Sequence, residues 1–270
     1  MLLGSLLLAI AAIIALAARG VGTGRRRAFL SEVVVVLFAF FAYHAVRSIT
    51  EGSVADALRH AQRLEDLERS IGLFVEPTLQ AAIVGEQWLV DLANWVYIWG
   101  HWPFIGVAAI WLYRAQPEGY RLYRNAFLIS GGIGLVMFMM FPTAPPRLAD
   151  LNVTDTVVKY SNFYYILQPP QLTNQFAAFP SLHFGWNMLI TVAIVRYAPA
   201  PVIRTLVVLV PAAMAVSIVV TANHYIVDAV AGGTVALLGL LLATMLQRRS
   251  RATKLAPEPV EAEPARTVRA

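Results

Sequence analysis

The stretch Ala222-Asn223-His224-Tyr225-Ile226-Val227-Asp228 opens an apolar run that continues to Leu246 and is long enough to cross a bilayer as a helix. A second stretch, Phe179-Pro180-Ser181-Leu182-His183, opens another such run. Each stretch places a histidine where a membrane helix meets water, and ionisable groups at membrane depth are costly and indicate function. His224 and Asp228 stand four residues apart on one helical face, where the carboxylate can orient the imidazole.

The composition indicates a membrane protein. The 270 residues are 58% hydrophobic and 14% charged, with a mean hydropathy of +0.62, whereas a soluble domain is about one quarter charged. The absence of cysteine excludes disulfides, a thiolate nucleophile and a zinc–thiolate site. The pI is near 9.7, but the basic residues form short clusters between apolar runs rather than a nucleic-acid-binding stripe, so no nucleic-acid partner is expected.

Seven apolar runs of roughly span length predict an all-α polytopic membrane helix bundle, with a six-helix core and one extra N-terminal span. The expected spans cover residues 2–18, 28–46, 88–112, 125–141, 181–196, 202–221 and 224–246. The expected organisation is N-terminal spans over 1–50, an interfacial amphipathic segment over 51–87, the main bundle over 88–246 with an outer loop over 143–180, and a disordered tail over 247–270. In the interfacial segment, apolar residues recur at helical spacing: Val54, Leu58, Ala61, Leu64, Leu67 and Ile71.

Charge predicts the orientation of these spans. Fifteen of the 21 Lys and Arg residues fall on the side that carries Arg25–Arg27 and the C-terminal tail, and six fall on the other side. Because basic residues concentrate on the cytoplasmic side, His183 and His224 are expected at the extracytoplasmic face. The composition favours a multi-pass protein of the cell (plasma) membrane.

The polar residues near the two histidines suit phosphoryl transfer, which needs a nucleophile, a proton donor and cations around the phosphate. Arg147 can place two donors on phosphate oxygens. Ser181 is expected as the N-cap of the helix that carries His183, whose first amides favour an anion. Tyr97 and His101 share one face of a predicted span with Asn94, and these three either line the cleft or tie helices together.

Two motifs resemble a known family. Pro180-Ser181-Leu182-His183 and His224-Tyr225-Ile226-Val227-Asp228 resemble the second and third signature motifs of the type-2 phosphatidic acid phosphatase superfamily. Pro142-Thr143-Ala144-Pro145-Pro146-Arg147-Leu148, together with Asn223, is similar to its inositol phosphorylceramide synthase-like (inositolphosphotransferase) branch. The resemblance covers roughly residues 53–246 and implies a metal-independent lipid phosphatase or phosphotransferase with no cofactor.

The resemblance also implies roles for individual residues. His224 would form a phosphohistidine, Asp228 would orient it, His183 would protonate the leaving group and Arg147 would hold the phosphate. The expected substrate-binding residues are Arg147, Ser181, Asn223, Tyr97 and His101. The substrate would be a phospholipid or lipid (di)phosphate of the outer leaflet. Water as acceptor gives a phosphatase, whereas a polyol such as inositol gives a transferase, and both remain open.

Two positions depart from the wider superfamily. Met140 stands where a Lys precedes the first-motif Arg, and Ile218 stands where an Arg precedes the third-motif His. Candidates to replace these cations are Lys159, Arg59, Arg63 and His101. The losses keep an alternative open, in which the chain is a non-catalytic lipid-phosphate binding or transport protein. A binding protein, however, has no need for Asp228 behind His224.

Overall fold

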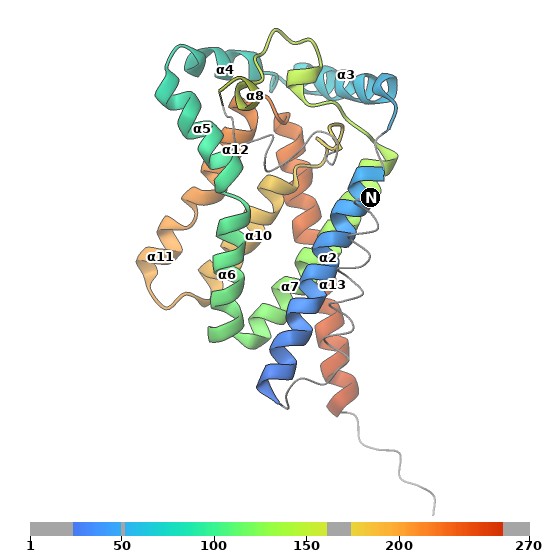
Figure 1. Ribbon diagram of the computed structural model, residues 1–270, viewed down its shortest axis with the longest axis vertical. Helices are drawn as coiled ribbons and strands as arrows, with labels where there is room; N and C mark the ends of the chain where they lie inside the picture. Colours follow the sequence, from blue (N-terminus) through green and yellow to red (C-terminus); the bar gives the residue numbers. More distant parts are fainter. Residues whose placement is uncertain (1–23, 50–51, 161–173, 256–270) are drawn as a thin grey trace, which may run out of the picture.

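The computed structural model describes residues 24–49, 52–160 and 174–255, and its regular elements are helices (Figure 1). They are α2 (Arg25–Ile49), α3 (Val54–Ser70), α4 (Glu76–Val84), α5 (Gln87–Trp99), α6 (Trp102–Ala115), α7 (Pro117–Met140), the short 3₁₀ helix η1 (Pro146–Leu148), α8 (Thr156–Tyr160), α10 (Leu182–Tyr197), α11 (Pro201–Leu206), α12 (Leu209–Val220) and α13 (Ile226–Leu255). Within those ranges, extended pairing is limited to one parallel bridge between Thr143 and Ala177. The predicted all-α class is confirmed.

Three helical segments are long and apolar enough to cross a membrane: Pro117–Met140, Pro201–Val220 and Ile226–Thr253. Helices α5 and α6 form a fourth span when taken together, although they bend by 44° where they meet. The predicted span at 88–112 is therefore a broken one. A broken helix is tolerated in a membrane only where protein or a polar cavity surrounds the break.

Two other predicted spans fall short of a full crossing. The apolar part of α2 is confined to Phe29–Tyr43, and α10 has only 16 residues. Sixteen helical residues rise about 24 Å, less than the ~30 Å of a bilayer core. Helix α10 packs against α6, α7, α12 and α13, so protein rather than lipid surrounds much of it. The predicted span at 2–18 lies outside the described residues.

Helix α13 is the central element of the bundle. It packs along α7 and α10, while α12 packs on α10 and α5, and α2 lies along α7 (Figure 1). Helix α3 lies across one end of this bundle, and α4 and α8 are at the same end (Figure 1). Helices α10 and α13 both begin near that end, so the fold brings the two predicted histidine motifs together.

Helix α3, in the predicted interfacial segment, buries only some of the apolar residues that recur at helical spacing. The side chains that it buries are Ala57, Ala61, Leu64 and Glu68, whereas Val54, Leu58, Leu67 and Ile71 are exposed. The alanines allow close approach, since the Ala144 amide donates to the Ala57 carbonyl at 3.1 Å. Small side chains therefore face the protein and the large apolar ones face outwards, as in a helix that lies at a membrane surface.

The opposite end of the bundle carries basic residues paired with acids. Arg124 pairs with Glu32 between α7 and α2, and Arg251 pairs with Glu118 at 2.7 Å between α13 and α7. Helix α13 continues to Leu255, beyond the predicted span end at 246, so the predicted tail starts as helix. Residues 256–270 lie outside the described part of the chain.

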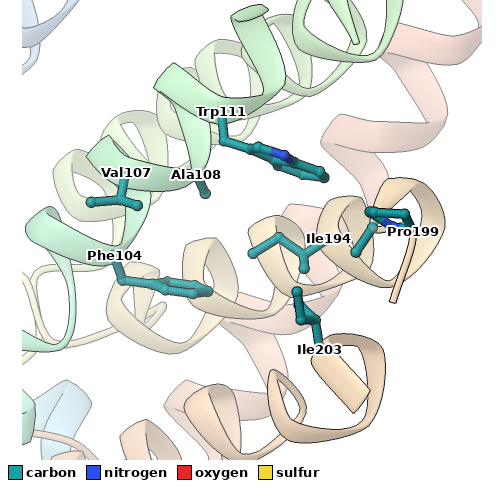
Figure 2. A pocket seen from close by; sticks show the side chains of 8 residues that line it. Phe104, Val107, Ala108, Trp111, Ile194, Pro199 and Ile203 are labelled. Atoms are coloured by element: carbon teal, nitrogen blue, oxygen red, sulfur yellow. The ribbon is translucent and has the colours of Figure 1, made fainter. Parts of the chain in front are cut away.

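An apolar cavity of about 290 Å³ lies between α6, α10 and α11 (Figure 2). Phe104 and Trp111 line one wall, and Ile194, Pro199 and Ile203 face them (Figure 2). None of the predicted site residues lines this cavity. The predicted site residues therefore lie elsewhere in the bundle.

Candidate active site

His183 and His224 lie side by side where α10 and α13 begin. Their ring centroids are 5.8 Å apart, with the rings tilted by 58°. The two helices approach so closely because Gly185 and Gly232 face each other: a Cβ at Gly185 would lie 2.3 Å from the Gly232 carbonyl oxygen. The two predicted histidine motifs thus form one site.

A tight turn between α12 and α13 presents His224. Ala222 has a left-handed φ of 56°, and the amides of Ala222 and Asn223 donate to the carbonyls of Val219 and Ile218, respectively. This is the hydrogen-bond pattern of a Schellman motif, which normally has glycine at the left-handed position. The His224 amide also donates to Ile218, at 3.0 Å. Backbone bonds therefore fix where the imidazole leaves the chain.

Asp228 lies directly behind His224, as the sequence predicted. His224 Nδ1 is 3.2 Å from Asp228 Oδ2, and the same oxygen accepts the Tyr225 amide at 2.9 Å. Asp228 is fully buried, and its carbonyl accepts the Ser181 amide at 2.9 Å. The tautomer with its proton on Nδ1 is the one that this carboxylate favours, which leaves the lone pair on Nε2.

Arg147 is tied to the same turn. Its amide donates to the Ala222 carbonyl at 3.0 Å, and its Nε donates to Asn223 Oδ1 at 3.0 Å. Its Nη1 lies 3.3 Å from Asp155 Oδ2. Asn223 in turn donates to Thr221 Oγ1 at 2.9 Å. Arg147 is therefore held beside the residue that precedes His224, where a cation can meet a phosphate.

The break between α5 and α6 supplies two more predicted residues. Tyr97 stacks on His183 at a centroid distance of 4.8 Å, and His101 lies 4.6 Å from His183. Asn187 Nδ2 donates to the His183 carbonyl at 2.8 Å and lies 3.1 Å from His101 Nδ1. The alternative that Tyr97 and His101 line the site is thus favoured. Asn94 instead ties α5 to Thr156 of α8.

The sequence profile described as the PAP2 superfamily matches residues 62–242. The chain belongs to the PAP2 superfamily. Comparison with curated proteins and with solved structures finds no match. The matched segment contains both histidines, Asp228 and Arg147, and the protein is therefore a PAP2-superfamily membrane protein built as a helix bundle.

Ser181 differs in part from its prediction. It stands at the N-cap position of α10, but its side chain makes no capping hydrogen bond. Its Oγ is fully buried and has no hydrogen-bond partner among the described residues. The Ser181 amide, by contrast, is committed to the carbonyl of Asp228. In this PAP2 protein the hydroxyl thus has an unused capacity to donate, next to the turn that carries His183.

The two positions that lack the expected cations have different surroundings. Met140 is 77% exposed at the end of α7, whereas Ile218 is fully buried in the core. Of the four candidate replacements, His101 lies beside a site histidine, with its ring centroid 4.6 Å from that of His183. Arg59 pairs with Asp56 on the outer face of α3, and Lys159 lies over the Tyr160 ring. Arg63 is exposed on α3.

Sequence reasoning missed two acids of the interfacial helices. Glu68 Oε1 accepts the Val227 amide at 2.8 Å, and Glu76 Oε1 accepts the Ile226 amide at 3.1 Å. Burial and the neighbouring Glu76 raise the pKa of Glu68 from 4.5 to about 9. The available signal was spacing, since Glu68 continues the i, i+4, i+7 positions of Ala57, Ala61 and Leu64 in α3.

Proposed function

We propose that this PAP2 protein is an integral membrane enzyme that transfers or hydrolyses the phosphoryl group of a membrane lipid through a phosphohistidine at His224. One observation carries the proposal: a buried carboxylate orients His224, and His224 faces a second histidine 5.8 Å away between ring centroids. The two imidazoles therefore lie beside one small volume, in which one can act as the nucleophile and the other as the acid.

The proposed reaction has two steps. His224 Nε2 attacks phosphorus, the bond between phosphorus and the leaving oxygen breaks, and His183 gives its proton to that oxygen. The acceptor hydroxyl then attacks phosphorus, the phosphorus–nitrogen bond breaks, and His183 takes the hydroxyl proton. Asp228 stabilises the positive charge that His224 acquires in the first step, because it is buried and holds Nδ1.

The phosphate is proposed to bind between Arg147, Ser181 and the α5–α6 break. Arg147 brings a fixed positive charge, and the buried Ser181 hydroxyl has a hydrogen bond to offer. His101 is proposed to contribute where the superfamily's missing cations would stand, since it lies 4.6 Å from His183. Tyr97 packs the other side of His183 and limits the orientations of its ring.

The finer specificity is proposed as inositolphosphotransferase-like, on the resemblance of Pro142–Leu148 and Asn223 to that branch. The contacts support a linked role for these residues, since Asn223 accepts from Arg147. A polyol acceptor such as inositol would take the place of water in the second step. The proposed setting is the outer leaflet, with the site on the extracytoplasmic face, because the paired basic residues lie at the opposite end of the bundle.

The test uses the purified full-length protein in detergent with a panel of lipid phosphates and diphosphates. Phosphate release and formation of a phosphorylated polyol are followed with and without inositol. We expect His224→Ala to abolish both, whereas Gln62→Ala, which changes an exposed side chain on α3, retains most of the activity. Quenching in alkaline detergent should trap an acid-labile, alkali-stable phosphoenzyme in the wild type and none in His224→Ala.

The outcomes separate the acceptors and the alternative. Phosphate release that depends on His224 identifies a phosphatase, and release that falls as phosphorylated inositol appears identifies a transferase. Lipid phosphate that binds equally to wild type and His224→Ala, without product from either, would instead favour the binding-protein alternative.

A further inference from the structure

The first turn of α13 is held by three carboxylates. The Tyr225 amide donates to Asp228 at 2.9 Å. The Ile226 amide donates to Glu76 at 3.1 Å, and the Val227 amide donates to Glu68 at 2.8 Å. A helix leaves its first amides without intrahelical partners, so buried amides here require acceptors from elsewhere. In this protein, the acceptors come partly from two other helices.

Glu68 and Glu76 come from α3 and α4, which are separate from α13 in the chain. Glu68 is fully buried at the end of the inward face of α3, and Glu76 is 1% exposed at the start of α4. Gln80, one turn further along α4, donates to the carbonyl of Val220 at 3.0 Å. The two interfacial helices therefore hold the chain on both sides of the turn that presents His224.

The two glutamate carboxyl groups interact with each other at the start of α13. A hydrogen bond between two carboxyl groups requires a proton on one of them. The Oε2 atoms of both residues are buried and have no hydrogen-bond partner among the described residues, and a proton shared between the two carboxyl groups would satisfy both atoms. Burial, together with the neighbouring acids Glu76 and Asp228, raises the pKa of Glu68 to about 9, so Glu68 carries a proton at neutral pH.

We propose that Glu68 and Glu76 are positioning residues, which share one proton and anchor the first turn of α13 to the interfacial helices so that His224 stays aligned with Asp228. This inference rests on the proposed function for its effect on turnover. Both glutamates hold this turn by its backbone, since their carboxylates accept the amides of Ile226 and Val227. Asp228 belongs to the same turn, and its amide donates to the Tyr225 carbonyl at 3.2 Å.

Isosteric and apolar substitutions of Glu68 test whether its hydrogen bond, rather than its size, keeps the turn in place. Glu68→Gln keeps an oxygen for the Val227 amide and supplies N–H donors to Glu76, so it mimics the protonated acid. Glu68→Leu is similar in size but leaves that amide without an acceptor. Since a displacement of about 1 Å costs about 10²-fold in rate, we expect kcat to fall about 10²-fold in Glu68→Leu.

The turnover experiment measures kcat and KM on the best lipid phosphate from the panel. Glu68→Gln should keep kcat close to the wild-type value, and Glu68→Leu should lose kcat with KM little changed. Glu76→Gln and Glu76→Leu should show the same contrast. The matched controls are Asp66→Asn and Asp66→Leu, which change an exposed acid on the same helix and should have little effect. Equal kcat values for Glu68→Leu and wild type would overturn the proposal.

A second readout does not need turnover. In protein labelled with ¹⁵N-histidine, the His224 signals are assigned by their loss in His224→Ala. We expect a single tautomer with the proton on Nδ1 in wild type and Glu68→Gln, and a mixture of tautomers in Glu68→Leu. An unchanged His224 tautomer in Glu68→Leu would refute the positioning role. A wild type that shows the tautomer but turns over no lipid phosphate would refute only the proposed function.

Discussion

Gly232→Ala tests whether the close approach of α10 and α13 creates the active site. A Cβ at position 232 would lie 2.0 Å from the carbonyl oxygen of Ser181 and 2.7 Å from its carbonyl carbon. Ordinary contact begins at 3.4 Å, so the backbones must separate by about 1.4 Å at this point, by difference from that limit. The clashing atoms are backbone, so no rotamer change can relieve the overlap.

The expected effect is larger on activity than on stability. Inserting a methyl group into a packed contact costs about 1–3 kcal/mol of folding free energy. A shift of about 1 Å in a catalytic group costs about 10²-fold in rate. Because Ser181 begins the helix that carries His183, the same shift moves His183 relative to His224. We therefore expect Gly232→Ala to fold with a lowered thermal midpoint and to lose about 10²-fold in kcat.

The assay compares Gly232→Ala with Gly132→Ala, which replaces a glycine inside α7. A Cβ at Gly132 meets nothing within 4 Å, so this variant should gain about 0.5–1 kcal/mol from helix propensity and keep its activity. Thermal unfolding and kcat are measured for both in the same detergent. If Gly232→Ala matches Gly132→Ala in kcat, the contact between Gly232 and Ser181 does not set the distance between the histidines.

The remaining predictions concern charge and protonation. Asp228→Asn should lower kcat about 10²- to 10⁴-fold, because the amide favours the wrong tautomer of His224. In a quenched time course the phosphoenzyme should still form, but slowly. An unchanged rate would exclude the orienting role of Asp228. Arg147→Lys should lower kcat/KM about 10²-fold, because lysine cannot keep the bond to Asn223 and also present a fixed donor to phosphate. An unchanged kcat/KM would mean that Arg147 does not bind the phosphate. The raised pKa of Glu68 means that the folded protein keeps a proton that the unfolded chain releases. Its contribution to stability is therefore full below about pH 4.5 and is lost as pH rises to about 9, at a slope of about 1.4 kcal/mol per pH unit. The free energy of unfolding, measured against pH, should lose this slope in Glu68→Gln. An identical slope in Glu68→Gln and wild type would contradict the shared proton.

The helices and the two histidine motifs could be predicted from local pattern. The predicted segment 181–196 is almost the observed α10, Leu182–Tyr197, because a long apolar run has few alternatives to a helix. The break at Gly100 and His101 was not predicted, since the run from 88 to 112 is continuous in hydropathy. The face of α3 that packs on the protein could not be told from the sequence either, because it includes Ala57, Ala61 and Glu68, which carry less hydrophobic signal than the leucines that face outwards.

The sequence by itself determined the class of protein and the residue types of the candidate site: apolar runs demand helices, and two histidines with an Asp four residues on suggest the chemistry. These features depend on residues that are close together in the sequence, so they can be predicted from local periodicity. Only the tertiary structure decided that His101 and Tyr97 flank His183, that Asn223 holds Arg147, and that Glu68 and Glu76 cap α13. Those contacts join residues that are far apart in sequence, and they form because buried amides and carboxyl groups must find partners wherever the packed helices place them.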